Sequence, residues 1–440
     1  MWNQKLYSSA LAVVLATTTV CPLQTFAAEE TKSTSRIPLE DVQRFSNAIS
    51  LIKKYYVKPV EDKELFANAI RGMVGSLDPH SAYLDEDEYK ELQTSTSGEF
   101  GGLGIEVTME EGVVKVVTPL VDSPAFKGGI KSGDYIIKLG TQSVQGISLK
   151  DAVELMRGKE GSTIELTVLR KGESKPLKFT LIREKIMVKS IKSELLDGNY
   201  GYIRITQFQA MTGDDMEKAV AQLKQQANGK LKGLILDLRN NPGGLLDSAI
   251  QISDAFLTND KSGKREMIVY TQGRFPGSKF TALANPGDIL DNAPMVVLIN
   301  NGSASASEIV AGALKDNKRA VIVGTRSFGK GSVQTVLPLD DKRGIKLTTA
   351  LYYTPSGTSI QAKGITPDIV IEEIKVSKND VTADGSDYSE ADLSGHLLNG
   401  DKNSDTTGPK KNDMSDNALL HRDYQLFAAL TVLKGLAVVK

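Results

Sequence analysis

The chain has 440 residues, of which 40% are hydrophobic, enough for roughly three domains of about 150 residues with buried cores. Its formal net charge is −1, and acidic and basic residues are mixed along it, so it lacks the basic field of a nucleic-acid-binding protein. Beyond the N-terminus, no apolar run approaches the ~18 residues that a membrane-spanning helix needs.

The N-terminus has the three-part pattern of a secretory signal peptide. A lysine precedes an apolar run from Ala10 to Val20, and "PLQTFAAEE" closes the pattern with small residues. We therefore expect residues 1–27 to be a signal peptide cleaved after Ala27, and the mature protein to be periplasmic. Lipidation of Cys21 is an alternative, which the bulky valine before it disfavours. Cleavage also removes Cys21, the single cysteine, so the mature chain can form no disulfide.

Residues 28–96 are predicted to be a helical region, with two amphipathic patterns that suit assembly. Within it, the acid-rich "LDEDEYKE" lacks the glycine and spacing of a calcium loop, so we interpret it as a solvated helix start. Residues 97–184 are predicted to be a small β-rich domain with one helix. Ser148 and Asp151 form the capping-box pattern at the start of that helix.

Residues 185–374 are predicted to form an α/β core. Short apolar strands, "GLILDL", "EMIVY", "MVVLI" and "AVIVG", alternate with helical or turn segments, as in a sheet buried on both faces. Residues 375–416 are rich in polar and charged residues, which predicts a disordered linker. A final helix in 417–440 is apolar around most of its circumference, so it needs a partner surface, either in its own domain or in another subunit.

A candidate nucleophile lies in "NNGSASASEIVAGAL", where a strand ends and a helix begins. Ser305 falls near the helix start, where unpaired backbone N–H groups and the helix dipole favour a developing oxyanion. The alternative is ordinary helix capping by Ser303, Ser305 or Ser307.

The α/β region contains no histidine that could act as the base for this serine. The three histidines, His80, His396 and His421, all lie outside it. A lysine can act as the base if its pKa falls from ~10.4 toward ~7 or 8, which burial achieves.

Lys330 is the candidate lysine, in "GTRSFGKGSVQTVLPL", where glycines allow close approach. In the strand that follows, Ser332 and Gln334 point to the same face as Lys330, so Gln334 is predicted to orient the amine by hydrogen bonding. "GTRSFGK" also fits the start of a nucleotide-binding phosphate loop, but Gly331 replaces the metal-binding hydroxyl and a strand-like segment follows.

Oxyanion donors are predicted from the turn in "LDLRNNPGG" and from the helix start. Gly243 or Gly244 would supply one backbone N–H and Ala306 another, although such a turn by itself is more often only a turn. No metal site is expected, because the mature chain has no cysteine and no H-E-x-x-H pattern.

Eight segments, in the same order, make the sequence similar to the carboxyl-terminal processing peptidases, also called tail-specific proteases, over nearly all of residues 40–373. They are "DPHSAYL", "GGLGIEV", "SPAFKGGIKSGDYIIK", "MRGKEGS", "LDLRNNPGG", "NNGSASASEIVAGAL", "VGTRSFGKGSVQ" and "GITPDIVI". The resemblance implies an α/β fold with a crotonase-like protease core, an inserted PDZ domain and helical terminal regions.

The resemblance also implies roles for individual residues. Ser305 matches the family's nucleophile, Lys330 its general base and Gln334 the glutamine four residues later, with oxyanion donors at Ala306 and the glycines of "NPGG". Residues of the PDZ domain are implied to bind the C-terminal carboxylate of a substrate or to couple its binding to activation. They are the "GGLGI" residues Gly102, Leu103, Gly104 and Ile105, and Arg157.

The resemblance implies an exported serine endopeptidase that needs no cofactor and acts through an acyl-enzyme on proteins with accessible C-termini. It also implies a homo-oligomer and an adaptor lipoprotein that would hold the enzyme near a membrane. The alternative function is a non-catalytic PDZ adaptor that binds protein tails.

Overall fold

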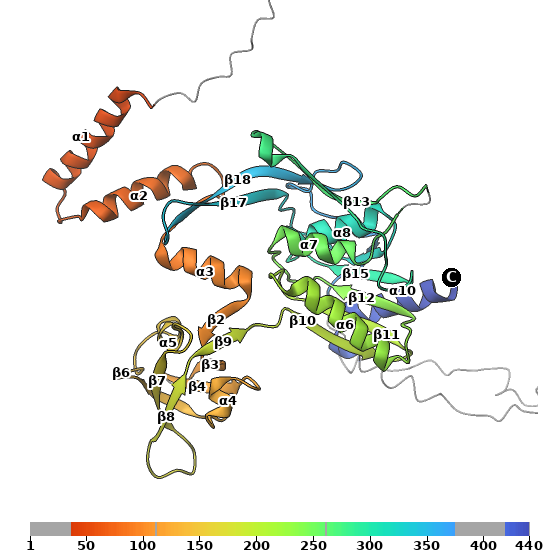
Figure 1. Ribbon diagram of the computed structural model, residues 1–440, viewed down its shortest axis with the longest axis horizontal. Coiled ribbons are helices and arrows are strands. Elements are labelled where there is room, and N and C mark those ends of the chain that lie inside the picture. The colour runs from red at the N-terminus through yellow and green to blue at the C-terminus, as the bar shows by residue number, and fades with distance from the viewer. Residues whose placement is uncertain (1–36, 111, 260–261, 375–418, 440) are drawn as a thin grey trace, which may run out of the picture. The chain divides into compact units, whose positions relative to one another are not determined.

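The computed structural model describes residues 37–110, 112–259, 262–374 and 419–439 (Figure 1). The expected signal peptide, His396 and the whole of the expected linker lie outside the described residues. The chain divides into two compact units, residues 1–68 and 69–440. No helix in the described ranges is long and apolar enough to cross a membrane.

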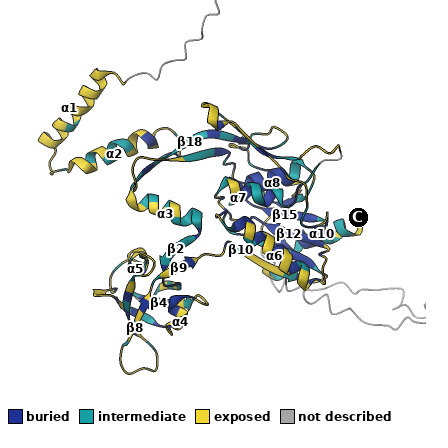
Figure 2. Ribbon diagram, viewed as in Figure 1, coloured by how far each residue is buried: buried dark blue, intermediate teal, exposed yellow. Residues whose placement is uncertain are grey.

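The first unit contains α1 (Leu39–Tyr55) and the start of α2 (Asp62–Gly75). Neither Phe45 nor Phe66 is buried, and their rings contact each other at 6.2 Å between centroids. No residue of α1 is buried, which Figure 2 shows as a yellow helix. The helices predicted for this region are therefore present, and the apolar residues of α1 are not buried by any described part of the chain.

The second unit begins with two elements from the expected helical region, β1 (Ala82–Leu84) and α3 (Glu86–Ser97). The acid-rich segment is indeed a helix start: Asp85 accepts a hydrogen bond from the Glu88 backbone N–H, and Glu88 accepts one from the Asp85 N–H, at 3.0 and 3.1 Å. This reciprocal cap satisfies two backbone donors that would otherwise be unpaired.

The small β domain has one main sheet with strand order β3-β4-β5-β7-β8, and β6 pairs with β5. Its elements are β3 (Ile105–Glu110), β4 (Val113–Pro119), α4 (Pro124–Lys127), β5 (Tyr135–Leu139), β6 (Gln142–Ser143), α5 (Leu149–Met156), β7 (Thr163–Leu169) and β8 (Leu177–Ile182). Ser148 and Asp151 cap α5 as predicted. The chain enters and leaves the domain through an antiparallel pair, β2 (Glu99–Gly102) and β9 (Glu184–Met187).

The α/β core has a six-stranded sheet with order β10-β11-β12-β15-β16-β19, parallel except for β10. The strands are β10 (Ile191–Leu196), β11 (Tyr200–Ile205), β12 (Gly233–Asp237), β15 (Met295–Ile299), β16 (Val321–Gly324) and β19 (Ile369–Val370). The helices are α6 (Thr212–Gln226), α7 (Leu246–Asp254), α8 (Ala306–Asp316) and α10 (Tyr424–Val439).

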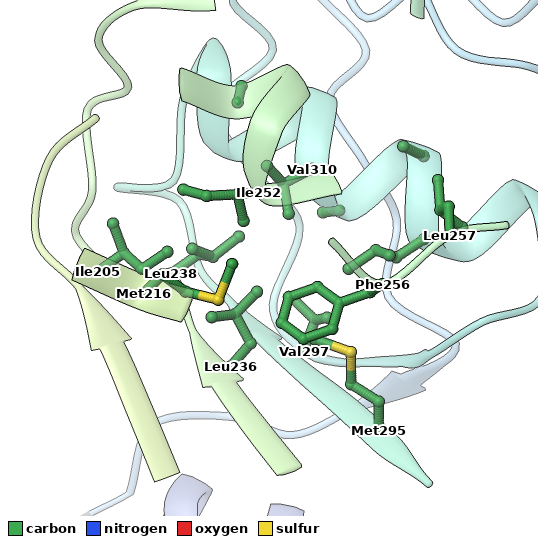
Figure 3. Close-up of a cluster of buried hydrophobic side chains, with 14 of the residues drawn as sticks. Ile205, Met216, Leu236, Leu238, Ile252, Phe256, Leu257, Met295, Val297 and Val310 are labelled. Carbon is green, nitrogen blue, oxygen red and sulfur yellow. The ribbon is translucent and has the colours of Figure 1, made fainter. Parts of the chain in front are cut away.

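The two faces of this sheet bury different side chains. Leu236 and Val297 pack into the cluster that includes residues of α6, α7 and α8, which Figure 3 shows in close-up. Ile235 and Leu298, one position along each strand, pack with Leu430 of α10 on the other face. Because successive side chains alternate across a strand, covering both faces requires the continuous apolar runs that the sequence shows. The expected α/β class is confirmed.

A second sheet of the core has the order β1-β18-β13-β14, with β17 also paired to β18. Its elements are β13 (Met267–Gly273), β14 (Phe280–Leu283), β17 (Ser332–Pro338) and β18 (Gly344–Tyr353), with a 3-10 turn η1 (Pro276–Ser278) before β14. β17 follows Lys330 directly along the chain, so this sheet carries the residues expected beside the candidate base.

Candidate active site

Ser305 occupies the position before the first turn of α8, in a backbone conformation that is rare for serine. Its φ is 54° and its ψ −111°. A positive φ in a non-glycine residue is strained and is found mainly where the surrounding structure holds it for a purpose. The turn between β15 and α8 places Ser305 beyond the end of the strand, where the residue is only 7% exposed.

The three serines of this segment make different hydrogen bonds. The Glu308 backbone N–H donates to the carbonyl oxygen of Ser305 at 2.9 Å. The hydroxyls of Ser303 and Ser307 donate to the carbonyl oxygens of Leu238 and Asn241, at 2.8 and 2.9 Å. The hydroxyls of Ser303 and Ser307 thus donate to backbone carbonyls, and a hydroxyl of Ser305 that accepts at the helix start still has its own proton to give.

Glu308 holds the backbones of both candidate residues. Its Oε2 accepts the N–H of Ser305 at 2.8 Å and the N–H of Lys330 at 2.9 Å. Its Oε1 accepts the Ser327 hydroxyl at 2.6 Å and the Gly329 N–H at 2.7 Å. Burial raises the pKa of Glu308, and these four hydrogen bonds oppose the rise. The fully buried carboxylate thus brings the backbones of Ser305 and Lys330 to one oxygen atom.

Sequence reasoning missed Glu308, although a signal was present. Glu308 follows Ser305 by three residues, which is the spacing of a capping box. Here the glutamate half of the box is made by the Glu308 side chain, which accepts the N–H of Ser305 at 2.8 Å.

Lys330 is half-buried, and its environment favours the neutral amine. Burial lowers the pKa of Lys330, and the positive charge of Lys346 lowers it further, while the charge of Glu308 acts in the opposite direction. No ion pair or hydrogen bond to Lys330 Nζ is present in the described part of the chain. A lysine in this state is suited to accept a proton.

Gln334 lies in β17 on the same face as Ser332. Its Nε2 donates to Ser332 Oγ at 2.9 Å and contacts Thr348 Oγ1 at 3.3 Å. The Gln334 side chain is therefore held from β17 and β18 rather than by Lys330.

The turn before α7 approaches Ser305 closely. A Cβ on Gly243 would lie 2.9 Å from Ser305 Cβ and 3.0 Å from the Ala306 nitrogen, so only glycine fits. The Gly243 N–H donates to Asn241 Oδ1 at 2.9 Å. In contrast, the N–H groups of Gly244 and Ala306 have no acceptor among the described residues. Of the three expected oxyanion donors, the structure thus leaves two uncommitted.

Tyr352 of β18 is a second residue that sequence reasoning missed. It is buried, and its phenol interacts with the side chain of Ser305. Burial raises the pKa of Tyr352 to about 12, and the interaction with Ser305 opposes the rise, so the phenol keeps its proton at neutral pH. Nothing in the local sequence indicates this contact, because β18 reaches the site only through sheet pairing.

In the small β domain, the "GGLGI" loop turns its carbonyl oxygens into the domain. The Leu103 carbonyl oxygen accepts the N–H of Ala125 at 3.0 Å, and that of Gly104 accepts the N–H of Leu120 at 2.8 Å. Gly104 has a φ of +69°, and a Cβ there would collide with Ser123. The N–H groups of Leu103 and Gly104 donate to no described residue, so the loop retains backbone donors for a ligand.

The remaining expected residues of this domain take different positions. Gly102 ends β2, and Ile105 opens β3 with its side chain partly buried against the domain core. The Arg157 guanidinium lies over the ring of Phe100, 4.7 Å from its centroid. Arg157 therefore lies where α5 meets the β2–β9 pair.

Comparisons with known proteins assign three parts of the chain. Residues 199–371 match Peptidase family S41, residues 101–181 a PDZ domain, and residues 10–88 the Activating protease CtpB N-terminal domain. These matches confirm the expected protease core and PDZ domain.

Similar proteins cover most of the chain. The carboxy-terminal-processing protease of Bartonella bacilliformis is 46% identical over 394 residues, 88% of this chain and 88% of the relative. Carboxy-terminal processing protease CtpB of Bacillus subtilis is 36% identical over 338 residues, 76% of this chain and 68% of the relative. A solved photosystem II D1 C-terminal processing protease is 31% identical, with 74% of this chain and 86% of that chain covered and a TM-score of 0.43.

The similarity extends over both the peptidase and the PDZ regions, and the Bartonella relative matches 88% of the chain. The chain therefore belongs to the carboxy-terminal processing proteases, serine peptidases of family S41 that carry a PDZ domain.

Proposed function

We propose that this peptidase is exported, recognises the C-terminal tails of proteins through its PDZ domain, and cleaves them with Ser305 as nucleophile and Lys330 as base. The observation that carries the catalytic part is the Glu308 carboxylate, whose Oε2 accepts the backbone N–H groups of both residues. The strained backbone of Ser305 and the lowered pKa of Lys330 support the same assignment.

The proposed reaction is acyl transfer. The neutral Lys330 amine accepts the Ser305 Oγ proton as Oγ bonds to the scissile carbonyl carbon. The N–H groups of Gly244 and Ala306 stabilise the oxyanion, and the protonated lysine gives its proton to the leaving amine as the C–N bond breaks. Water then attacks the ester with Lys330 again accepting a proton, and Ser305 regains its hydroxyl as the acid product leaves. Gln334 helps to orient the amine.

Substitution of each partner tests this proposal. Ser305→Ala and Lys330→Ala should each abolish hydrolysis of an unfolded protein, measured by release of labelled fragments, while binding of a C-terminal peptide to the PDZ domain is retained. Lys342→Ala, at an exposed lysine of the β17–β18 turn, is the control and should cleave normally. Normal turnover by Lys330→Ala would exclude the dyad.

Export and assembly are further parts of the proposal. The signal-peptide pattern supports a periplasmic location, and the uncovered apolar residues of α1 support oligomer formation. Cell fractionation and N-terminal sequencing of the mature protein test the first. Light scattering of the purified enzyme, with and without a candidate adaptor lipoprotein, tests the second.

A further inference from the structure

The turn after α2 is joined by hydrogen bonds to Gln334. Asp78 Oδ1 accepts the backbone N–H groups of His80 and Ser81 at 2.8 and 3.0 Å, and the Thr348 hydroxyl at 3.0 Å. Thr348 lies in β18, opposite Gln334 of β17. Its Oγ1 is in turn 3.3 Å from Gln334 Nε2. A carboxylate outside the dyad thus reaches Gln334 through one hydroxyl.

Thr348 is held at two points by this turn. Its backbone N–H donates to Ser81 Oγ at 3.0 Å, and Ser81 Oγ donates to Asp78 Oδ2 at 2.6 Å. Burial raises the pKa of Asp78, but the hydrogen bonds from Ser81, His80 and Thr348 lower it below its usual value. Asp78 is therefore ionised at neutral pH and can only accept hydrogen bonds.

Counting the protons fixes the orientation of the Gln334 amide. Because ionised Asp78 can only accept, the Thr348 hydroxyl hydrogen points to Asp78. Thr348 Oγ1 then has only lone pairs to offer Gln334, so the NH2 end of the amide faces Thr348. The two ends of an amide have nearly the same shape, and the surrounding donors and acceptors decide between them. The Gln334 carbonyl oxygen is left as an acceptor directed elsewhere.

The same turn lies within electrostatic reach of the candidate base. Burial lowers the pKa of His80, and the positive charge of Lys330 lowers it further. His80 is two residues from Asp78, so the turn approaches both Lys330 and Gln334. Its position suits a part in arranging the base.

We propose that Asp78 is a positioning residue for catalysis, which acts through Thr348 to hold the Gln334 amide with its carbonyl oxygen available to the Lys330 amine. This inference rests on the proposed function, since it takes Lys330 as the base. An amine that donates to a carbonyl oxygen has its lone pair directed by that bond. A reversed amide would present its NH2 group and oppose the protonated lysine.

The test is a double-mutant cycle between Thr348 and Gln334. Thr348→Val keeps the shape of the side chain and removes the hydroxyl, so we expect kcat to fall about tenfold, the effect of losing one hydrogen bond, with KM little changed. In a Gln334→Ala background, Thr348→Val should cause no further loss. Thr349→Val is the matched control, because Thr349 bonds Thr335 instead and should leave kcat unchanged.

The pH profile separates positioning from structural damage. In Thr348→Val the Gln334 amide is no longer held, so its carbonyl oxygen is lost as an acceptor that stabilises the protonated Lys330. The pKa of Lys330 should therefore fall, and the rising limb of kcat/KM should move to lower pH. Asp78→Ala should move the limb in the same direction, and neither change should move it when Gln334 is alanine. If Asp78→Ala does not fold, the Thr348 cycle decides alone.

Two results would overturn the inference. One is that Thr348→Val lowers kcat equally in the wild-type and Gln334→Ala backgrounds; the other is that it changes neither kcat nor the rising limb of kcat/KM. Failure of the proposed function would give a different result. Lys330→Ala would then cleave normally, and the inference would fall with it. If Lys330→Ala is inactive while the Thr348 and Gln334 effects are additive, the dyad stands and only the role of Asp78 is lost.

Discussion

At the level of single residues, the backbone N–H before the first turn of α8 is bound by the side chain of Glu308. Glu308 accepts the N–H of Ser305 and three further donors from the segment Ser327 to Lys330. The backbone of the candidate nucleophile is thereby held in a strained conformation by a side chain other than its own.

Glu308→Gln replaces one accepting oxygen with an NH2 group that faces buried donors. Each donor left without an acceptor costs about 1–3 kcal/mol. We expect the free energy of unfolding to fall by roughly 2–5 kcal/mol, and kcat to fall with little change in KM. Denaturant unfolding and steady-state kinetics measure the two effects. Glu217→Gln, exposed on α6, is the control, and identical behaviour of the two variants would contradict the role of Glu308.

The pH dependence of cleavage should follow the lowered pKa of Lys330. The proposed mechanism requires the neutral amine, so kcat/KM should rise with pH through a midpoint below the ordinary lysine value of about 10.4.

Lys346→Gln removes a nearby positive charge and should raise the pKa of Lys330, which moves this limb to higher pH and lowers activity at neutral pH. Lys342→Gln, at an exposed lysine, should leave the limb in place. A limb that Lys346→Gln shifts to lower pH would show that the sign is wrong.

The residues that the sequence alone indicated are those with a local pattern. Ser305 was indicated by a strand followed by a helix, and Lys330 by its glycine-flanked position before a strand. Tyr352 has no such pattern. Asp78 lies in the segment "DPHSAYL", but nothing there indicates its link to Gln334, since β18 connects both residues to the site through sheet pairing between residues far apart in the chain. Local propensity carries no information on which strands pair.

At the level of elements, α10 takes its partner surface from its own core. Its buried residues pack on strands β12 and β15, together with Ile235 and Leu298. Gly233 makes room for this contact, because a Cβ there would lie 2.8 Å from Leu433 Cδ1. Asp423 caps the helix by accepting the Leu426 N–H at 3.0 Å and binds Arg239 at 2.7 Å, close to the turn that carries Gly243.

Leu433→Ala should leave a cavity between α10 and the sheet. Leu433 is fully buried, so we expect the free energy of unfolding to fall by about 2–5 kcal/mol. Val438→Ala, in the same helix but 86% exposed, should change it by no more than about 0.5 kcal/mol. Denaturant unfolding measures both. Equal effects would mean that α10 does not contribute its apolar face to the core.

The sequence predicted the type of most elements because their periodicity is strong. The segments "GLILDL", "EMIVY", "MVVLI" and "AVIVG" all form strands, and the capping box at Ser148 begins a helix. "EMIVY", however, forms β13 of the second sheet, not a strand of the buried parallel sheet expected for all four. The last helix was expected from about residue 417, whereas α10 begins at Tyr424 because Asp423 interrupts the helical run there. From the sequence, the apolar surface of this helix could pack either on its own domain or on another subunit. An apolar helix surface alone does not distinguish these two partners.

At the level of the whole molecule, the chain contains a PDZ domain and a peptidase core that have separate hydrophobic clusters. The PDZ domain has its own buried cluster, and the chain passes between it and the peptidase core through β2 and β9. Separate cores allow recognition and cleavage to be altered independently.

A substrate whose C-terminus is capped as an amide tests the recognition half. The carboxylate charge is lost, so the backbone donors of the "GGLGI" loop have a weaker acceptor, and we expect KM to rise with kcat little changed. Competition between free-acid and amide forms of one peptide measures the preference. The control is a peptide in which a side-chain carboxylate away from the C-terminus is converted to an amide. Equal cleavage of both forms would show that the loop does not read the carboxylate.

The shared carboxylate of Glu308 also limits how this enzyme can be switched on and off. The loop that bears the lysine and the helix that bears the serine are fastened to the same atom, so they have to travel together. A switch that pulls the dyad apart would have to break buried, charge-assisted bonds, whereas one that reshapes the β17–β18 pair or the glycine turn would leave them intact. Control of activity is therefore expected to act on the surroundings of the dyad.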